Sequence, residues 1–116
     1  MVIRQGDIFW VNFSPARGPE PKGRRPALVI QADSFNNSKI NTVIVLAITS
    51  NLKYENLPGN VRLVKREGGM PRASVINVSQ IKTIDREYLE SKIGSISSVK
   101  LNRVKEGLKL VFDLNS

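Results

Sequence analysis

The run at residues 41–49 constrains the fold of this chain more than any other stretch. Between Val43 and Ile48 the residues are apolar without a break, and most of them are β-branched. An unbroken run of this kind is typical of a strand that is buried on both faces. The chain therefore needs a sheet with this strand at its centre. Polar surroundings begin where the run ends, at Thr49 and Ser50.

Shorter apolar segments supply the rest of this sheet. We predict further strands at residues 8–13, about 25–32, 60–65, 73–78 and 80–84. The last two could form one bent strand. Residues 33–38 and 85–89 each suit one helical turn, and Gly68-Gly69 predicts a tight turn.

The last predicted element is a helix. The residues that recur at helical spacing (i, i+3, i+7, i+10) are Leu101, Val104, Leu108 and Val111. Ser97 or Ser98 is the expected N-cap, and the helix should end near Asp113. Strands first and a helix last predict a mainly β, α+β layout. We expect a small curved sheet capped by the helix, in a single domain over residues 1–116.

Charge and missing residue types restrict the function. The 18 Lys and Arg outnumber the 10 Asp and Glu, which gives a net charge of +8. Such a basic domain usually meets nucleic acid, an acidic protein or an anionic membrane, although the charge could serve solubility alone. The chain has no Cys and no His, which excludes disulfides, thiol catalysis and His-based acid–base pairs. We therefore expect no metal site and no cofactor.

The hydropathy of the chain bears on its location. No run of about 18 apolar residues is present, so we expect no transmembrane helix. The first residues lack the apolar core of a signal peptide. The expected location is the cytoplasm.

A cationic loop precedes the second predicted strand. Gly and Pro punctuate residues 18–23. The cations of this region are Lys22, Arg24 and Arg25. Pro26 biases Arg25 toward an extended backbone, and the apolar run at 27–30 follows directly. A cationic loop tied to a rigid strand suits the handling of an anion, with Arg25 at the junction.

Without His and Cys, this residue set still permits phosphoryl transfer within RNA, because the 2′-hydroxyl attacks its own neighbouring phosphorus. Arg25 suits the stabilisation of the added negative charge, since its fork matches two phosphate oxygens. The alternative is that Arg25 is a solvent-exposed loop charge with no role in a reaction. Thr49 ends a rigid strand, so its hydroxyl could bind a phosphate oxygen or relay a proton. It could equally be a strand-end Thr with no such role.

Three other polar residues are weaker candidates. Glu20 is the only carboxylate in the cationic loop. It could act as a general base, or it could pair on the surface with Lys22 or Arg24, which is the commoner arrangement. Ser74 and Gln80 flank the last strand pieces and could line a groove.

Several motifs together resemble the MazF/PemK family of toxin endoribonucleases. The matching segments are Gly6-Asp7-Ile8, Ser14-Pro15, Gly18, Glu20, Gly23, residues 25–31, residues 41–45, residues 47–49, residues 74–76, Gln80-Ile81, and Thr83-Ile84-Asp85. The match covers nearly the whole chain, and its specificity comes from the combination. One departure lies in the loop, where Pro21 and Lys22 replace residues that are often Gln and Gly in the family.

The resemblance implies a fold and an activity. The fold is an SH3-like small barrel of about five to seven strands with a C-terminal helix, assembled as a homodimer. The activity is metal-independent, sequence-specific cleavage of single-stranded RNA that leaves a 2′,3′-cyclic phosphate and a 5′-hydroxyl. The essential Arg and Thr of the family match Arg25 and Thr49. The implied partner is an antitoxin whose acidic tail covers the RNA groove.

The implied substrate extends the list of candidate residues. RNA contacts are expected from Arg17, Lys22, Arg24, Lys53, Ser74 and Gln80. Trp10 and Tyr54 could stack on bases, although a core role suits Trp10 better.

Two alternatives stay open from the sequence. A related toxin with the same barrel binds DNA gyrase without catalysis, but it depends on a terminal Trp-Gly-Ile-type ending. Residues 112–116 here read Phe-Asp-Leu-Asn-Ser, which argues against that function. The other alternative is a barrel that binds RNA and leaves it uncut.

Overall fold

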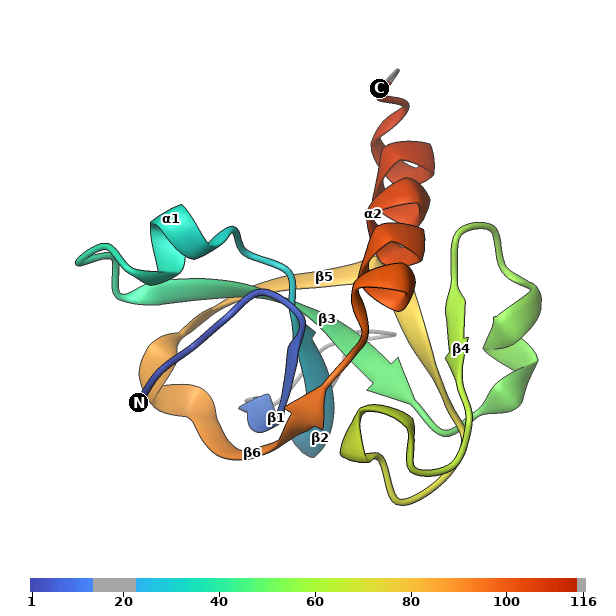
Figure 1. The fold of residues 1–116 in the computed structure, drawn as a ribbon, viewed down its shortest axis with the longest axis horizontal. Coiled ribbons are helices and arrows are strands. Elements are labelled where there is room, and N and C mark those ends of the chain that lie inside the picture. Colours follow the sequence, from blue (N-terminus) through green and yellow to red (C-terminus); the bar gives the residue numbers. More distant parts are fainter. Residues whose placement is uncertain (14–22, 115–116) are drawn as a thin grey trace.

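A computed structural model describes residues 1–13 and 23–114 of the protein. Within these ranges lie six strands and two α-helices, joined by three short 3-10 helices (Figure 1). The strands are β1 (Asp7–Phe13), β2 (Gly23–Val29), β3 (Thr42–Thr49), β4 (Val61–Leu63), β5 (Ser74–Asp85) and β6 (Leu89–Ser95). The helices are α1 (Asp33–Asn36), η1 (Leu52–Asn56), η2 (Glu67–Gly69), η3 (Arg86–Tyr88) and α2 (Ser98–Phe112).

The described strands form one curved antiparallel sheet in the order β4-β5-β3-β2-β1-β6. β3 lies inside this sheet, between β5 and β2, as its unbroken apolar run predicts. α2 stands against β5 and β4 (Figure 1). The predicted mainly β layout with a C-terminal helix is therefore confirmed.

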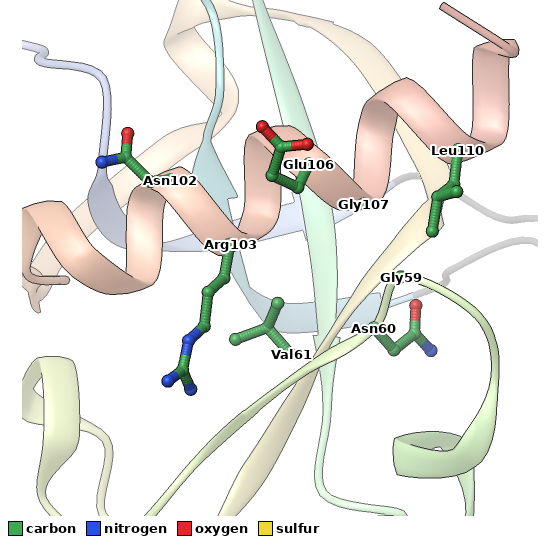
Figure 2. Close-up of a pocket in the computed structure, with 8 residues that line it drawn as sticks. All are labelled: Gly59, Asn60, Val61, Asn102, Arg103, Glu106, Gly107 and Leu110. Atoms are coloured by element: carbon green, nitrogen blue, oxygen red, sulfur yellow. The ribbon is translucent and has the colours of Figure 1, made fainter.

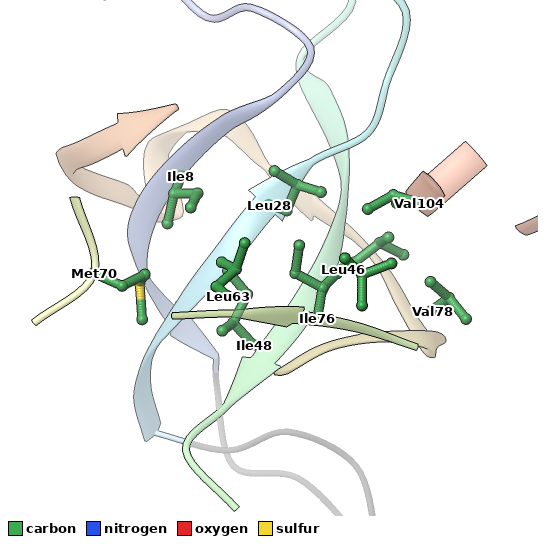
Figure 3. Close-up of a cluster of buried hydrophobic side chains, with 10 residues drawn as sticks. Ile8, Leu28, Leu46, Ile48, Leu63, Met70, Ile76, Val78 and Val104 are labelled. Carbon is green, nitrogen blue, oxygen red and sulfur yellow. The ribbon is translucent and has the colours of Figure 1, made fainter. Parts of the chain in front are cut away.

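Both faces of β3 are buried between Val45 and Ile48, which explains why the apolar run has no polar break there, whereas Ile44 is 36% exposed. On one face Leu46 and Ile48 join a cluster with residues of β1, β2, β5 and α2 (Figure 3). On the other face Val43 and Val45 pack with a second cluster. The second cluster also contains Phe9, Val11, Phe13, Ala27 and Val29. Each buried side chain of this size stabilises the fold by about 1.5 to 3 kcal/mol.

α2 begins and ends where the sequence indicates. The Ser97 hydroxyl oxygen accepts a hydrogen bond from the amide of Lys100 at 3.2 Å. Asp113 follows the helix with a φ of 55° and serves as its C-cap. Val104 is fully buried in the core cluster, whereas Val111, the last member of the predicted apolar stripe, is 40% exposed. None of the helices in residues 1–13 and 23–114 is long and apolar enough to span a membrane.

Two segments differ from the prediction. β2 begins at Gly23, inside the predicted loop, because the backbone of residues 23–25 pairs with β1. β2 also ends earlier, at Val29, since the amides of Ile30 and Gln31 both donate to the carbonyl of Ile44 and interrupt regular pairing. β6 was not predicted, because its sequence Leu-Glu-Ser-Lys-Ile-Gly-Ser has no strand-like alternation.

The remaining predictions are confirmed with small changes of length. The two predicted pieces at 73–78 and 80–84 form the single bent strand β5. The strand predicted at 60–65 is shorter, Val61–Leu63. Helical turns form at α1 and at η3, where Asp85 Oδ1 accepts from the Glu87 amide.

Gly68 and Gly69 form the predicted turn, with φ values of 65° and 80°. A Cβ atom on Gly94 would meet the carbonyl of Gly68, so the absence of a side chain lets η2 pack directly on β6. This contact fixes the start of the connection that runs from η2 to β5.

Candidate active site

Arg25 and Thr49 lie at the same end of the sheet. Ala27 pairs with Ala47 across β2 and β3, and Leu28 pairs with Leu46. Continuation of this antiparallel register by two residues sets Arg25 opposite Thr49. Both then lie on the sheet face that carries the two alanines, because side chains alternate along a strand.

The side chains of this pair differ in their surroundings. Arg25 is exposed, and Thr49 is half-buried at the last position of β3. The Thr49 hydroxyl oxygen accepts a hydrogen bond from the amide of Asn51 at 3.1 Å. Because a hydroxyl also carries one hydrogen to donate, this bond positions the oxygen and leaves the donor function for a ligand. An always-charged fork beside an oriented hydroxyl can bind a phosphate group.

The bend in β5 brings Gln80 to this end of β3. Leu46 pairs with Ile81 and Ile48 pairs with Ile76, so residues 77–80 together stand opposite Ala47. Such a bulge bends the strand and redirects its side chains. Gln80 on β5 therefore lies opposite Ala47, which is two residues before Thr49 on β3.

Ser74 lies at the first position of β5, next to Val75, which pairs with Thr49. Ser74 as a whole residue is 1% exposed, and its hydroxyl donates to the carbonyl of Arg72 at 3.0 Å. In this structure the hydroxyl therefore orders the Arg72 backbone.

Arg24 lies on the opposite face from Arg25. It pairs with Asn12, and its guanidinium stands over the ring of Trp10, 4.3 Å from the ring centroid. The Arg24 Nε also lies 2.6 Å from Oε1 of Glu90 on β6. A cation–π contact and an ion pair together hold the side chain in one place.

A cavity of about 380 Å³ opens beside Arg24. Residues from four separate segments line it, among them Trp10, Arg24, Pro26, Ile48, Met70 and Arg72. Arg25 and Ser74 also contribute to the lining. The cavity therefore adjoins the Arg25–Thr49 end of the sheet. Sequence reasoning did not identify Met70, Arg72 or Glu90, because no local motif marks them.

The other predicted site residues do not line this cavity or lie outside the described residues. Lys53 is exposed on η1, where its amide donates to the Asn51 side chain at 3.1 Å. Arg17, Glu20 and Lys22 lie outside the described residues.

A second cavity, of about 360 Å³, lies between α2 and the segment before β4. Figure 2 shows Arg103 and Leu110 extending from α2 toward Gly59 and toward Val61, the first residue of β4. None of the predicted site residues that the structure describes lines this cavity.

A shifted pKa occurs away from both cavities, at Asp33. The amide of Gln5 donates to Asp33 Oδ1 at 2.7 Å, and the Asn36 side chain donates to the same oxygen at 3.0 Å. These two bonds, the Gln5 bond first, hold the pKa of Asp33 below its ordinary value. This carboxylate links the N-terminal segment to α1.

Comparison with known proteins assigns the family. The family model of the PemK-like, MazF-like toxin of type II toxin–antitoxin systems matches residues 4–112. Endoribonuclease MazF6 of Mycobacterium tuberculosis is 40% identical over 114 residues, which cover 98% of this chain and 100% of the relative. The chain belongs to this family of PemK-like and MazF-like toxins, as its motifs predict.

Solved structures share the fold over the whole length. MazF from Deinococcus radiodurans superposes with a TM-score of 0.82 at 25% identity, covering 98% of this chain and 99% of that chain. A mycobacterial endoribonuclease in complex with its cognate antitoxin gives a TM-score of 0.80 at 16% identity, covering 98% of both chains. The second likeness bears on the fold alone.

Proposed function

We propose that this chain is the toxin of a type II toxin–antitoxin system and that it inhibits translation by cleaving single-stranded RNA, including mRNA, at specific sequences. The observation that carries the proposal is the Arg25–Thr49 pair. An arginine and an oriented hydroxyl lie at one end of the sheet, in a chain whose relatives over the full length are named endoribonucleases. The charge of +8 supports a polyanionic substrate.

The proposed reaction is an attack of the RNA 2′-hydroxyl on the adjacent phosphorus. The bond from the 2′-oxygen to phosphorus forms and the bond from phosphorus to the 5′-oxygen breaks. The products are a 2′,3′-cyclic phosphate and a 5′-hydroxyl. A base removes the 2′-hydroxyl proton, and the leaving 5′-oxygen gains a proton. No metal is required for this balance.

Each candidate residue has one part in this reaction. Arg25 stabilises the charge that develops on the phosphorane oxygens and helps to protonate the leaving oxygen. Thr49 donates its hydroxyl hydrogen to a phosphate oxygen or relays a proton. Glu20 is the candidate for removing the 2′-hydroxyl proton.

The remaining predicted residues contact the RNA outside the reacting phosphate. These are Arg17, Lys22, Arg24, Lys53, Ser74 and Gln80. The cations neutralise phosphates, which makes binding strongly dependent on salt. The position of Gln80 in the β5 bulge, opposite Ala47, supports its choice.

The assembly proposed for the chain is a cytoplasmic homodimer of single-domain subunits. Its partner is an antitoxin with an acidic segment, which the positive charge of the toxin would attract. A bound antitoxin in a mycobacterial endoribonuclease of the same fold supports this choice of partner.

Cleavage of a long single-stranded RNA in excess EDTA tests the proposal. We expect cuts at defined sequences that end in cyclic phosphate. Arg25→Ala and Thr49→Val should each lower the rate by about a hundredfold or more, because each removes a donor aimed at developing charge. RNA that is bound but uncut by the wild-type protein would identify a non-catalytic RNA-binding barrel instead.

Matched controls separate catalysis from folding. Thr42 and Thr49 are the first and last residues of β3 and are both half-buried, so Thr42→Val controls for Thr49→Val. Arg62 is an exposed arginine paired with Glu55 at 2.9 Å and lines neither cavity, so Arg62→Ala controls for Arg25→Ala. Both controls should cut at the wild-type rate. Full activity of Arg25→Ala or Thr49→Val would remove that residue from the mechanism.

A further inference from the structure

The cavity beside Arg24 has a chemistry of its own. Its lining includes the apolar side chains of Pro26, Ile48 and Met70, and the last two belong to the core cluster (Figure 3). The same lining holds Trp10 and three arginines, Arg24, Arg25 and Arg72. A free phosphate would use the arginines alone and leave the aromatic and apolar side chains without a partner. A flat, apolar group with polar edges suits it better.

Arg24 is held in place before any ligand binds. Its guanidinium is fixed on one side by the Trp10 ring at 4.3 Å and at Nε by Glu90 at 2.6 Å. The Arg24 side chain is nevertheless 53% exposed, so part of it can meet a ligand. Because these contacts already restrict its rotamers, binding costs less conformational entropy than for an unrestrained arginine.

The segment that carries Arg72 is also held in place. The buried Ser74 hydroxyl donates to the Arg72 carbonyl, which fixes the backbone beside the cavity. Arg72 belongs to the connection from η2 to β5, and the glycine turn of η2 packs on β6 at Gly94. Arg24 and Arg72 therefore reach the cavity from two separate segments, and each segment is held by its own contacts.

The position of the cavity relates it to the proposed cut. Arg24 and Arg25 are adjacent residues on opposite faces of β2, and Arg25 contributes to the cavity lining. A phosphate held by Arg25 and Thr49 thus lies at the same end of the sheet as the cavity mouth. The base of a neighbouring nucleotide can turn into the cavity while the phosphate stays in place.

We infer that this cavity binds one RNA base next to the cleaved phosphate and so sets part of the sequence preference. Trp10 and Arg24 provide a stacking wall, Ile48 and Met70 provide the apolar floor, and Arg72 faces the polar edge of the base. Recognition of unstacked bases by aromatic and guanidinium planes is a common mode for single-stranded RNA. The inference rests on the proposed function and adds a base-reading site to it.

The fluorescence of Trp10 reports directly on ligand binding in the cavity, since Trp10 is the only Trp in the chain. The probe is an RNA containing the mapped cut site, with a 2′-deoxy nucleotide there to prevent cleavage. Matched probes carry an abasic nucleotide at one position each. We expect the intact probe to change Trp10 emission. One abasic probe, at a position next to the cut, should lose this change and bind about tenfold more weakly.

Arginine variants test which base is read. In a randomised RNA pool, Arg24→Ala and Arg72→Ala should each reduce the base preference at that same position by about tenfold, the scale of one lost base contact. Arg62→Ala is the matched control and should keep the wild-type preference. Arg24→Lys keeps a positive charge near Glu90 but lacks the planar group, so it should also lose the preference. Circular dichroism and melting curves check that each variant is folded.

Three results would overturn the inference. One is an unchanged base preference in both arginine variants while the wild-type protein cleaves RNA. Another is the same Trp10 response to every abasic probe. The third is a Trp10 response to a glutamate-rich peptide but not to RNA, which would assign the cavity to a protein partner. Failure of the wild-type protein to bind or cut any RNA would instead contradict the proposed function, and the base site with it.

Discussion

Arg24 and Arg25 are neighbours in the chain, yet the structure gives them different surroundings. Arg24 lies against Trp10 and Glu90 on the face of the sheet that holds the cavity. The side chain of Arg25 alternates to the other face, although Arg25 also borders the cavity. Continuation of the β2–β3 register beyond Ala27 and Ala47 sets Arg25 opposite Thr49. The alternation of a single strand thus separates two cations that composition alone would treat as one basic patch.

The difference between the two sides indicates different tasks. An arginine held by a ring and a carboxylate presents a fixed plane, which suits the reading of a base. An exposed arginine beside an oriented hydroxyl suits a group whose charge grows during a reaction. We therefore expect changes on the Arg25 side to alter rate and changes on the Arg24 side to alter selectivity.

After Arg25→Ala, the largest effect should come from Arg25→Lys. Lysine keeps the charge but loses the fork that binds two phosphate oxygens. We expect the cleavage rate to fall by about a hundredfold, with base preferences unchanged. Single-turnover cleavage of the randomised RNA pool measures both quantities. A shift in base preference as large as the change in rate would show that the two sides do not act separately.

A smaller effect is expected from Trp10→Leu, which removes the ring under Arg24. We expect about a tenfold loss of preference at the position read by the cavity. Because Trp10 is half-buried, the free energy of unfolding should fall by about 1 to 2 kcal/mol. Chemical denaturation followed by circular dichroism gives the second value. Retention of the full preference would remove Trp10 from base recognition.

Glu90→Gln should act more weakly still, because it loosens Arg24 without removing it. The pair is exposed, so the free energy of unfolding should change by less than about 1 kcal/mol. We expect the base preference to weaken by less than about fivefold, and the rate at the preferred site to stay unchanged. Glu55→Gln, which loosens Arg62 in the same way, is the matched control. Equal effects of the two substitutions on base preference would argue against a role for the Arg24 contact.

The smallest effects concern pH. The chain has no His, so the cleavage rate should show no ionisation near pH 6.5 unless Glu20 or another group is strongly shifted. Measurement of the cleavage rate from about pH 5.5 to about pH 7.5 checks this expectation. A clear bell centred there would require such a shifted group.

Asp33 contributes a separate, acid-dependent term to stability. Hydrogen bonds from Gln5 and Asn36 lower the pKa of Asp33 in the folded state. Its contribution is therefore fully present above the unfolded-state pKa and is lost as pH falls through the folded-state pKa. Wild type should exceed Asp33→Asn in melting temperature at neutral pH, and the difference should shrink below about pH 4. A melting-temperature difference that grows as the pH falls would contradict a lowered pKa of Asp33 in the folded state.

Much of the fold could be predicted from local patterns. The apolar run of β3 and the capped helix α2 both carry their signals within a few residues. β6 could not be predicted, since it is a mostly polar edge strand held by backbone pairing with β1. Its formation depends on a neighbour about 80 residues away in the sequence, which single-strand patterns do not encode.

The candidate site was predictable to a similar extent. Arg25 is marked by Pro26 and the strand after it, and Thr49 by its place at the end of β3. The cavity has no such signal, because Trp10, Ile48 and Arg72 come from segments that are far apart in the sequence and meet only in the folded sheet. Sequence reasoning therefore finds the residues that end a strong element, and it misses those that the sheet assembles from distant segments.

The division between the two arginines can be tested in one measurement. Wild type, Arg24→Ala and Arg25→Ala are compared in single-turnover cleavage of one randomised RNA pool in EDTA, with rate and base frequencies read together. We expect Arg25→Ala to lose about a hundredfold or more in rate and to keep its base preferences. Arg24→Ala should stay within about tenfold of the wild-type rate and lose the preference at one position. Equal losses of rate and of preference in the two variants would contradict the division.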